Sequence, residues 1–464
     1  MRKFSIFISI ISFLAALLCL FKLVASSFAA VSAMPIVFSL AFPVLFPMSY
    51  RNQNRRITVV LAYSLFFIRM VFLPVYGIFD GYYDSEVSST LNSYCNQSVL
   101  LSIYEFIAVS VILYSRPSSG MNRIQRPIHL ALSGNRLIYW ALVLIAVILY
   151  YRVGRNLGMF EFGVKSIGGE YERSGDVELG GIDRLLIGTG VNFLFFLFIS
   201  YFSKRYLICH NQKYVVFSIV VAMIMICIIT GERRTSQIYK GFACIWLLIG
   251  LYPSYKKKIS GSLLMVAALV IAGMTLYKQY HAFLYDSYAE ALSHASGIGM
   301  STGILDAYFY GVNTISKNLA FSDMGFVNYS NLVYDFARNI FGLNFFMPSG
   351  GSLTSELYNL TLSSGESATG YLLSSVGYGY VYFGFLLAPI FTCLTILILV
   401  TIEKWMRSTS SIEMAYIWSF LFMRFGFGLL GSFPPLINMA TRVLFVNGGI
   451  VLAATFFNKS LKKI

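Results

Sequence analysis

The chain has 464 residues, of which 57% are apolar and only 12% are charged, and its mean hydropathy is +0.70. In soluble globular domains roughly a quarter of the residues are charged, so this composition excludes an ordinary soluble protein and indicates an integral membrane protein. The formal net charge is +15. Its distribution along the chain indicates membrane topology and gives no reason to expect a nucleic-acid partner.

Apolar runs recur along the whole chain, separated by short polar segments. A membrane-spanning helix needs roughly 20 largely apolar residues, so these runs predict about twelve transmembrane helices. The expected fold is therefore an all-α polytopic membrane protein. The predicted spans are residues 4–26, 28–48, 57–77, 97–115, 137–153, 184–203, 214–231, 235–253, 260–277, 370–401, 412–430 and 440–457.

The segments between the spans alternate in charge. Every second one is basic, from Arg2 and Lys3 to Lys459, Lys462 and Lys463, and these segments together hold more than half of the 35 lysines and arginines. The positive-inside rule assigns the basic set to the cytoplasm. The prediction is a multi-pass protein of a bacterial inner membrane with both termini in the cytoplasm.

One predicted outer loop is much longer than the others. Residues 1–277 hold nine spans with short loops, residues 278–369 form the long loop, and residues 370–464 hold three more spans. A loop of roughly 90 residues is usually functional. Apolar residues at helical spacing in 280–292 and 303–319 predict amphipathic helices, so we expect a folded helical cap.

Ionisable residues inside a span are expensive and are candidates for function. Arg69 in the third span and Glu105 in the fourth lie at matched depth, because each is about eight residues, or 12 Å at 1.5 Å per residue, from its outer end. The two spans are antiparallel neighbours. The sequence predicts a buried ion pair that holds these helices in register.

A second group of cations lies at predicted outer ends of spans or in the long loop. Arginine binds phosphate well because its planar guanidinium forms two parallel hydrogen bonds and stays charged when it is partly desolvated. The alternative is that these side chains reach outer headgroups or pair with nearby acids such as Glu232 or Asp335. The group comprises Arg233, Arg234, Lys278, Arg338, Arg424 and Arg442.

Acid and base candidates are few. His281 opens the long loop and Glu366 lies in a Ser/Gly-rich stretch just before the tenth span; either could accept a proton from a hydroxyl, although a loop histidine or a helix-capping stretch can equally be structural. The six cysteines show no C-x-x-C spacing, so the sequence predicts no metal site.

The layout resembles that of the Wzy-type O-antigen polymerases, which join oligosaccharide repeat units. The resemblance covers nearly the whole chain and includes a few short stretches: Thr230-Gly231-Glu232-Arg233-Arg234 before a span, Leu276-Tyr277-Lys278-Gln279-Tyr280 at the start of the long loop, the Ser/Gly-rich segment before the tenth span, and Thr441-Arg442-Val443-Leu444-Phe445 at the start of the last.

This resemblance implies a glycosyltransferase of the GT-C-like membrane class with its active face in the periplasm. Its substrates would be a donor and an acceptor glycan, each linked to undecaprenyl pyrophosphate, with no nucleotide sugar, metal or other cofactor. Arg233 and Arg234 would grip the donor pyrophosphate, and Lys278, Arg424 and Arg442 would neutralise the leaving group. Arg338 would position a substrate. Further partners would be membrane lipids and a chain-length regulator of the Wzz type.

Two other functions stay open. An O-antigen ligase has a similar layout, but we would expect a functional histidine well inside its long loop, where only His294 is available. A lipid-linked oligosaccharide flippase also has about twelve spans, but such transporters tend to have short loops and internal repeats. The long loop and the lack of a repeat favour the polymerase.

Overall fold

The computed structural model describes residues 2–51, 55–83, 89–115, 130–154, 161–163, 181–229, 235–279, 287–293, 301–347, 353–362 and 372–461. The regular structure in these residues is helical apart from one pair of short strands. The chain forms two compact units. Unit 1 contains residues 1–122, 299–404 and 425–441, and unit 2 contains residues 123–298, 405–424 and 442–464. Each of the three sequence segments 1–277, 278–369 and 370–464 therefore contributes to both units.

Several helices can cross a bilayer, which makes the chain an all-α polytopic membrane protein. In the described residues, seven segments are long and apolar enough alone, and one bent helix pair qualifies jointly. The other predicted spans, 137–153, 214–231, 235–253 and 412–430, each overlap a shorter helix, and the number twelve remains a prediction. The seven segments are Lys3–Leu23, Ala29–Tyr50, Arg56–Phe79, Thr90–Ser115, Leu185–Cys209, Pro253–Thr275 and Pro434–Ser460.

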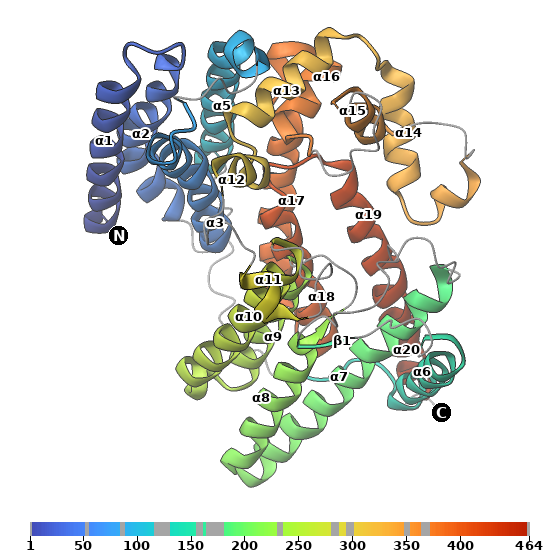
Figure 1. Ribbon diagram of the computed structural model, residues 1–464. Coiled ribbons are helices and arrows are strands. Elements are labelled where there is room, and N and C mark those ends of the chain that lie inside the picture. The colour runs from blue at the N-terminus through green and yellow to red at the C-terminus, as the bar shows by residue number, and fades with distance from the viewer. Residues whose placement is uncertain are drawn as a thin grey trace. The chain divides into compact units, whose positions relative to one another are not determined.

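Unit 1 combines the first helices of the chain with most of the long loop (Figure 1). Its elements are α1 (Arg2–Leu23), η1 (Ala29–Ser32), α2 (Ala33–Tyr50), α3 (Arg56–Phe67), the π-helix η3 (Ile68–Phe72), α4 (Leu73–Phe79), α5 (Ser89–Ser115), α12 (Thr302–Phe309), α13 (Val312–Asp323), α14 (Tyr329–Asn339), η7 (Leu343–Phe346), α15 (Thr354–Leu362), α16 (Ser375–Leu387) and most of α17 (Ile390–Ser408) and α19 (Pro434–Val443).

Helix α5 is the centre of unit 1 and packs against α2, α13 and α16. Leu101 of α5, Ile315 and Leu319 of α13, and Val376 of α16 form one fully buried apolar cluster. Because α13 belongs to the long loop, part of that loop is built into the core of the unit. The predicted amphipathic stretch 303–319 thus packs its apolar side on protein.

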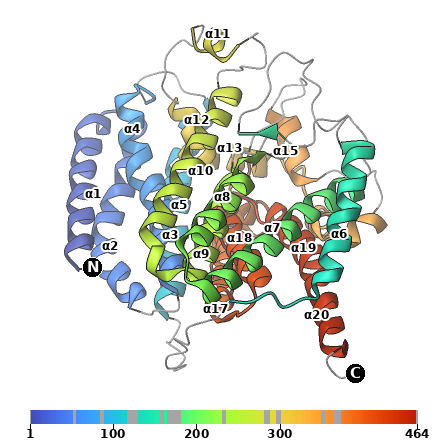
Figure 2. The same cartoon turned by 90° about the horizontal axis from the view of Figure 1, so that it is seen from below.

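Unit 2 is built around α6 to α10 (Figure 2). Helix α6 packs on α7, and α8, α9 and α10 pack on one another. Its elements are α6 (Arg136–Leu149), the π-helix η4 (Tyr150–Gly154), β1 (Glu161–Phe162), α7 (Gly181–Cys209), α8 (Gln212–Cys227), β2 (Ile228–Ile229), α9 (Thr235–Leu251), η5 (Pro253–Tyr255), α10 (Lys256–Gln279), α11 (Tyr288–Ser293), most of α18 (Ile412–Phe427), the π-helix η8 (Leu444–Gly448) and α20 (Gly449–Leu461).

The tenth predicted span, 370–401, is broken in the structure. Helices α16 and α17 meet at an angle of 107°. Gly384 has φ 68° and ψ −169°, a conformation that is essentially restricted to glycine, and Pro389, just before α17, has no N–H to continue a helix. The Tyr104 hydroxyl of α5 donates to the Leu386 carbonyl over 2.8 Å, which satisfies a backbone group freed by the bend.

The bend therefore depends on one glycine, and replacing it should cost stability. We expect Gly384→Ala to destabilise the protein by about 1–3 kcal/mol, because alanine is strained at this φ and ψ. The measurement is the melting temperature of the purified protein in detergent. Gly261→Ala is the control, since Gly261 lies in α10 with open space around it, and it should be neutral or stabilising. Equal melting temperatures for both variants would argue against a glycine-dependent bend.

Candidate functional site

Arg69 and Glu105 form the ion pair that their matched depth predicts. Both side chains are fully buried, and Arg69 Nη1 donates to Glu105 Oε2 while its Nη2 donates to Ser102 Oγ over 3.0 Å. The Thr392 hydroxyl of α17 donates to the second carboxylate oxygen of Glu105. The pair thus links η3, α5 and α17, and does so next to the bend.

Two further carboxylates hold helix α12 above this pair. Asp80 Oδ2 accepts hydrogen bonds from the backbone N–H and hydroxyl of Thr302 at 2.8 and 2.7 Å, and these bonds lower the pKa of Asp80. Asp306 Oδ2 accepts the N–H and hydroxyl of Thr314 at 2.8 and 2.7 Å. Burial nevertheless raises the pKa of Asp306, although these bonds and the nearby positive charge of Arg69 oppose the shift.

The polar side chains of Asp335 and Asn318 connect the helices of the long loop to α16 through hydrogen bonds. Asp335 of α14 accepts the Tyr378 hydroxyl at 2.7 Å and the Thr354 N–H at 3.0 Å. Asn318 of α13 accepts the N–H and hydroxyl of Ser374 at 3.0 and 2.7 Å and donates to the Tyr358 hydroxyl at 2.8 Å. Because all these groups are buried, each bond is costly to lose. Helices α13, α14 and α15 therefore form a folded cap on α16.

Unit 2 contains two half-buried cations, Lys240 on α9 and Arg424 on α18, which together are called the cationic group here. Arg424 Nη1 donates to the Tyr239 hydroxyl over 3.3 Å, and its guanidinium lies 5.7 Å from the centre of the Tyr239 ring. Lys240, the next residue, donates to the Ile228 carbonyl over 2.7 Å. Gln237 Nε2 donates to the same carbonyl over 3.2 Å. No described carboxylate forms a salt bridge with Arg424 or Lys240.

The carbonyl of Ile228 receives hydrogen bonds from both Lys240 and Gln237. Ile228 belongs to β2, which pairs with β1, and residues 230–234, which include Arg233 and Arg234, come next in the sequence. Gln237 Oε1 and Arg424 Nε are buried and have no hydrogen-bond partner in the described part of the chain. Unpaired buried polar atoms call for an explanation, such as a ligand.

The other predicted site residues are placed as follows. Arg338 lies exposed in the last turn of α14, where its Nη1 donates to the Asn344 carbonyl over 3.4 Å. Arg442 is half-buried in the last turn of α19. The span begins at Pro434, earlier than predicted, because prolines are well suited to the first turn of a helix; Arg442 thus lies about 12 Å along it at 1.5 Å per residue.

The remaining predicted residues are not described. Lys278 lies at the end of α10, without a described side chain, and Arg233, Arg234, His281 and Glu366 fall outside the described residues. The structure therefore brings together Arg69 and Glu105, whereas a single cluster of all the outer cations remains a prediction.

The sequence analysis missed three ionisable residues in or near predicted spans. Lys240 was detectable, since it lies well inside the predicted span 235–253. Glu403 and Glu413 are fully buried near predicted cytoplasmic ends of spans; Glu403 accepts the backbone N–H groups of Ile57 and Thr58 at the start of α3. Anions are stabilised at helix N-termini, so this carboxylate has a structural role.

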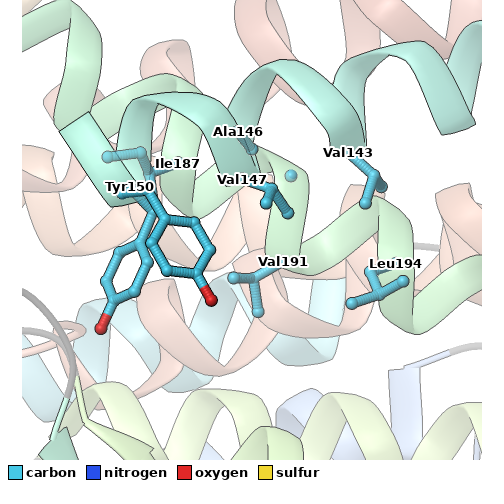
Figure 3. A pocket seen from close by; sticks show the side chains of 9 residues that line it. Val143, Ala146, Val147, Tyr150, Ile187, Val191 and Leu194 are labelled. Atoms are coloured by element: carbon cyan, nitrogen blue, oxygen red, sulfur yellow. The ribbon is translucent and has the colours of Figure 1, made fainter. Parts of the chain in front are cut away.

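An apolar groove of about 160 Å³ runs between α6 and α7 (Figure 3). Tyr150 lies at one end and Val143 and Leu194 lie at the other. Gly190 of α7 allows the helices to approach closely, because a Cβ there would come within 2.2 Å of the Ala146 Cβ. The lining is suited to a hydrocarbon chain. Among the described residues, no group of three or more His, Cys, Asp or Glu could hold a metal ion.

The buried ion pair yields a stability prediction. Glu105→Ala should destabilise the protein by about 3–5 kcal/mol, because it leaves the Arg69 charge buried without a partner. The double variant Arg69→Met/Glu105→Leu should recover most of this loss, since the apolar side chains need no countercharge. Melting temperatures of the single and double variants in detergent test this, with the exposed Lys257→Met as control. A double variant as unstable as Glu105→Ala would contradict it.

No protein-family model, curated protein or solved structure matches the chain. What it does must therefore be inferred from its own residues and its layout.

Proposed function

We propose that this chain is an O-antigen polymerase, a membrane-embedded glycosyltransferase that works at the periplasmic face. It would transfer a growing glycan from undecaprenyl pyrophosphate to a new lipid-linked repeat unit. The observation that carries this proposal is the cationic group of Lys240 and Arg424, with which no described carboxylate forms a salt bridge; Lys240 donates to the carbonyl of Ile228, a few residues before Arg233 and Arg234 in the sequence. A pyrophosphate would supply the missing negative charge.

In the reaction, an acceptor hydroxyl attacks the anomeric carbon of the donor glycan. The bond between that carbon and the pyrophosphate oxygen breaks, and undecaprenyl pyrophosphate leaves with the electron pair. Arg424 and Lys240 would stabilise the negative charge on the leaving group. Glu366 or His281 would accept the proton of the acceptor hydroxyl.

One other feature supports a lipid-linked substrate. The groove between α6 and α7 belongs to the same unit as the cationic group, and an isoprenoid tail needs such an apolar surface.

Deleting the gene in its host distinguishes the three candidate functions. For a polymerase we expect surface polysaccharide that carries single repeat units only, visible as the loss of the long-chain ladder on a gel. Lipid-linked long chains without surface attachment would instead identify a ligase, and single lipid-linked units that accumulate in the cytoplasm would identify a flippase. Complementation with the wild-type gene is the control.

The role of the cationic group can be tested separately. Lys240→Met and Arg424→Met should each abolish the long polysaccharide chains while the protein stays inserted and at least as stable, because each variant removes a half-buried charge that no described carboxylate neutralises. The readouts are the polysaccharide ladder and the melting temperature of each variant. Lys257→Met, which removes an exposed charge, should leave both unchanged. Polysaccharide of normal length from both variants would refute a role of Lys240 and Arg424 in pyrophosphate binding.

A further inference from the structure

The cap carries an exposed apolar edge, which consists of residues 324–347 and includes α14 and η7. Val333 is 67% exposed and Phe346 is 84% exposed. Several exposed apolar side chains in one short segment indicate an interaction site. The exposed apolar side chains of this cap edge are Met324, Phe326, Tyr329, Val333, Leu343, Phe345 and Phe346.

The cap edge is held firmly against the bent helix pair. Phe336 of α14 packs on Phe391 with ring centres 5.9 Å apart, and Tyr329 packs on Phe383 at 6.3 Å. Asp335 adds its buried hydrogen bonds to Tyr378 and Thr354. In the view of Figure 1, α14 lies next to α15 in the same unit. Its exposed side chains therefore cannot turn inward without breaking these contacts.

The contacts of α14 also fix its depth. Phe383 and Phe391 lie on either side of the bend in the membrane-embedded pair α16–α17. At the bend itself, Leu386 is 75% exposed, and Phe385 and Leu387 are exposed too. Such residues face lipid in a membrane protein. Helix α14 therefore packs on the helix pair that carries this exposed apolar bend.

The charges of the cap edge fit a lipid surface. Between residues 324 and 347 the only carboxylate is Asp335, which is buried, and the only cation is Arg338, which is exposed. Amphipathic segments with aromatic and aliphatic side chains on one side and a basic residue nearby lie in the membrane interface. An arginine there can reach lipid phosphates.

We propose that the cap edge is an interfacial anchor that inserts Val333, Phe345 and Phe346 into the outer leaflet of the bilayer. The bilayer would thus add to the protein contacts that already hold the cap on the bent helix pair. The anchor is independent of the proposed polymerase activity, since it rests on exposure, packing and charge alone.

Tryptophan reporters in lipid nanodiscs test this anchor. The four natural tryptophans are replaced by phenylalanine, and Phe346→Trp or Val333→Trp is introduced into full-length protein in nanodiscs that hold one copy. We expect brominated phosphatidylcholine to quench both reporters as strongly as Leu386→Trp at the bend, and several-fold more strongly than Ser355→Trp. Ser355 is an exposed polar residue on α15 of the same cap.

Every other outcome overturns the proposal. Reporters quenched by soluble acrylamide and not by brominated lipid would place the edge in water. Reporters shielded from both quenchers in single-copy nanodiscs would show that another part of this chain covers the cap edge. If the shielding arises only in proteoliposomes, which hold several copies, a second copy covers it. Unchanged melting temperatures confirm that the reporter variants are folded, and agreement between the positions 333 and 346 excludes a local artefact.

Discussion

A charge buried in a bilayer must meet an opposite charge and enough hydrogen-bond partners, and this constraint determines how the helices of unit 1 meet. The permanent charge of Arg69 needs a partner at its depth, and Glu105 of α5 lies opposite it; the second oxygen of that carboxylate accepts the hydroxyl of Thr392. The three groups come from η3, α5 and α17. The π-helix at Arg69 fits this arrangement, because single turns of this kind reorient one side chain without ending the helix.

The bend and the position of the cap are also determined by the need of buried polar groups for hydrogen-bond partners. Because α17 is held by Glu105 and the bend by the Tyr104 hydroxyl, α5 fixes both sides of the break in the helix pair. The cap is then attached to α16 through Asn318 and Asp335. If α16 moved, it would either break several buried hydrogen bonds to the cap or move together with the cap. Moving together costs much less free energy, because the hydrogen bonds are kept. The bent pair and the cap should consequently behave as one rigid body.

Features set by composition over many residues were predictable from the sequence, whereas features set by single contacts were not. Hydropathy located the helices, and equal distances from the span ends located the ion pair of Arg69 and Glu105. The bend could not be predicted, because hydropathy alone predicts one long span for the apolar run that contains Gly384 and Pro389. Only the backbone angles show that the helix is broken there. Lys240 could have been recognised from its position alone, but its carbonyl partner depends on the pairing of β1 with β2, two strands that are too short to leave a sequence pattern.

The fully buried Arg69 and the half-buried Lys240 and Arg424 differ in which groups neutralise or solvate their charge. The charge of Arg69 is cancelled by a carboxylate and serves structure. Lys240 donates to a carbonyl and Arg424 to a tyrosine hydroxyl and ring, and these dipoles satisfy hydrogen bonds but leave the net charge in place. A cation in a membrane protein that lacks a countercharge is a functional candidate. Under the proposed function, a substrate phosphate would give Lys240 and Arg424 the countercharge that Glu105 gives Arg69.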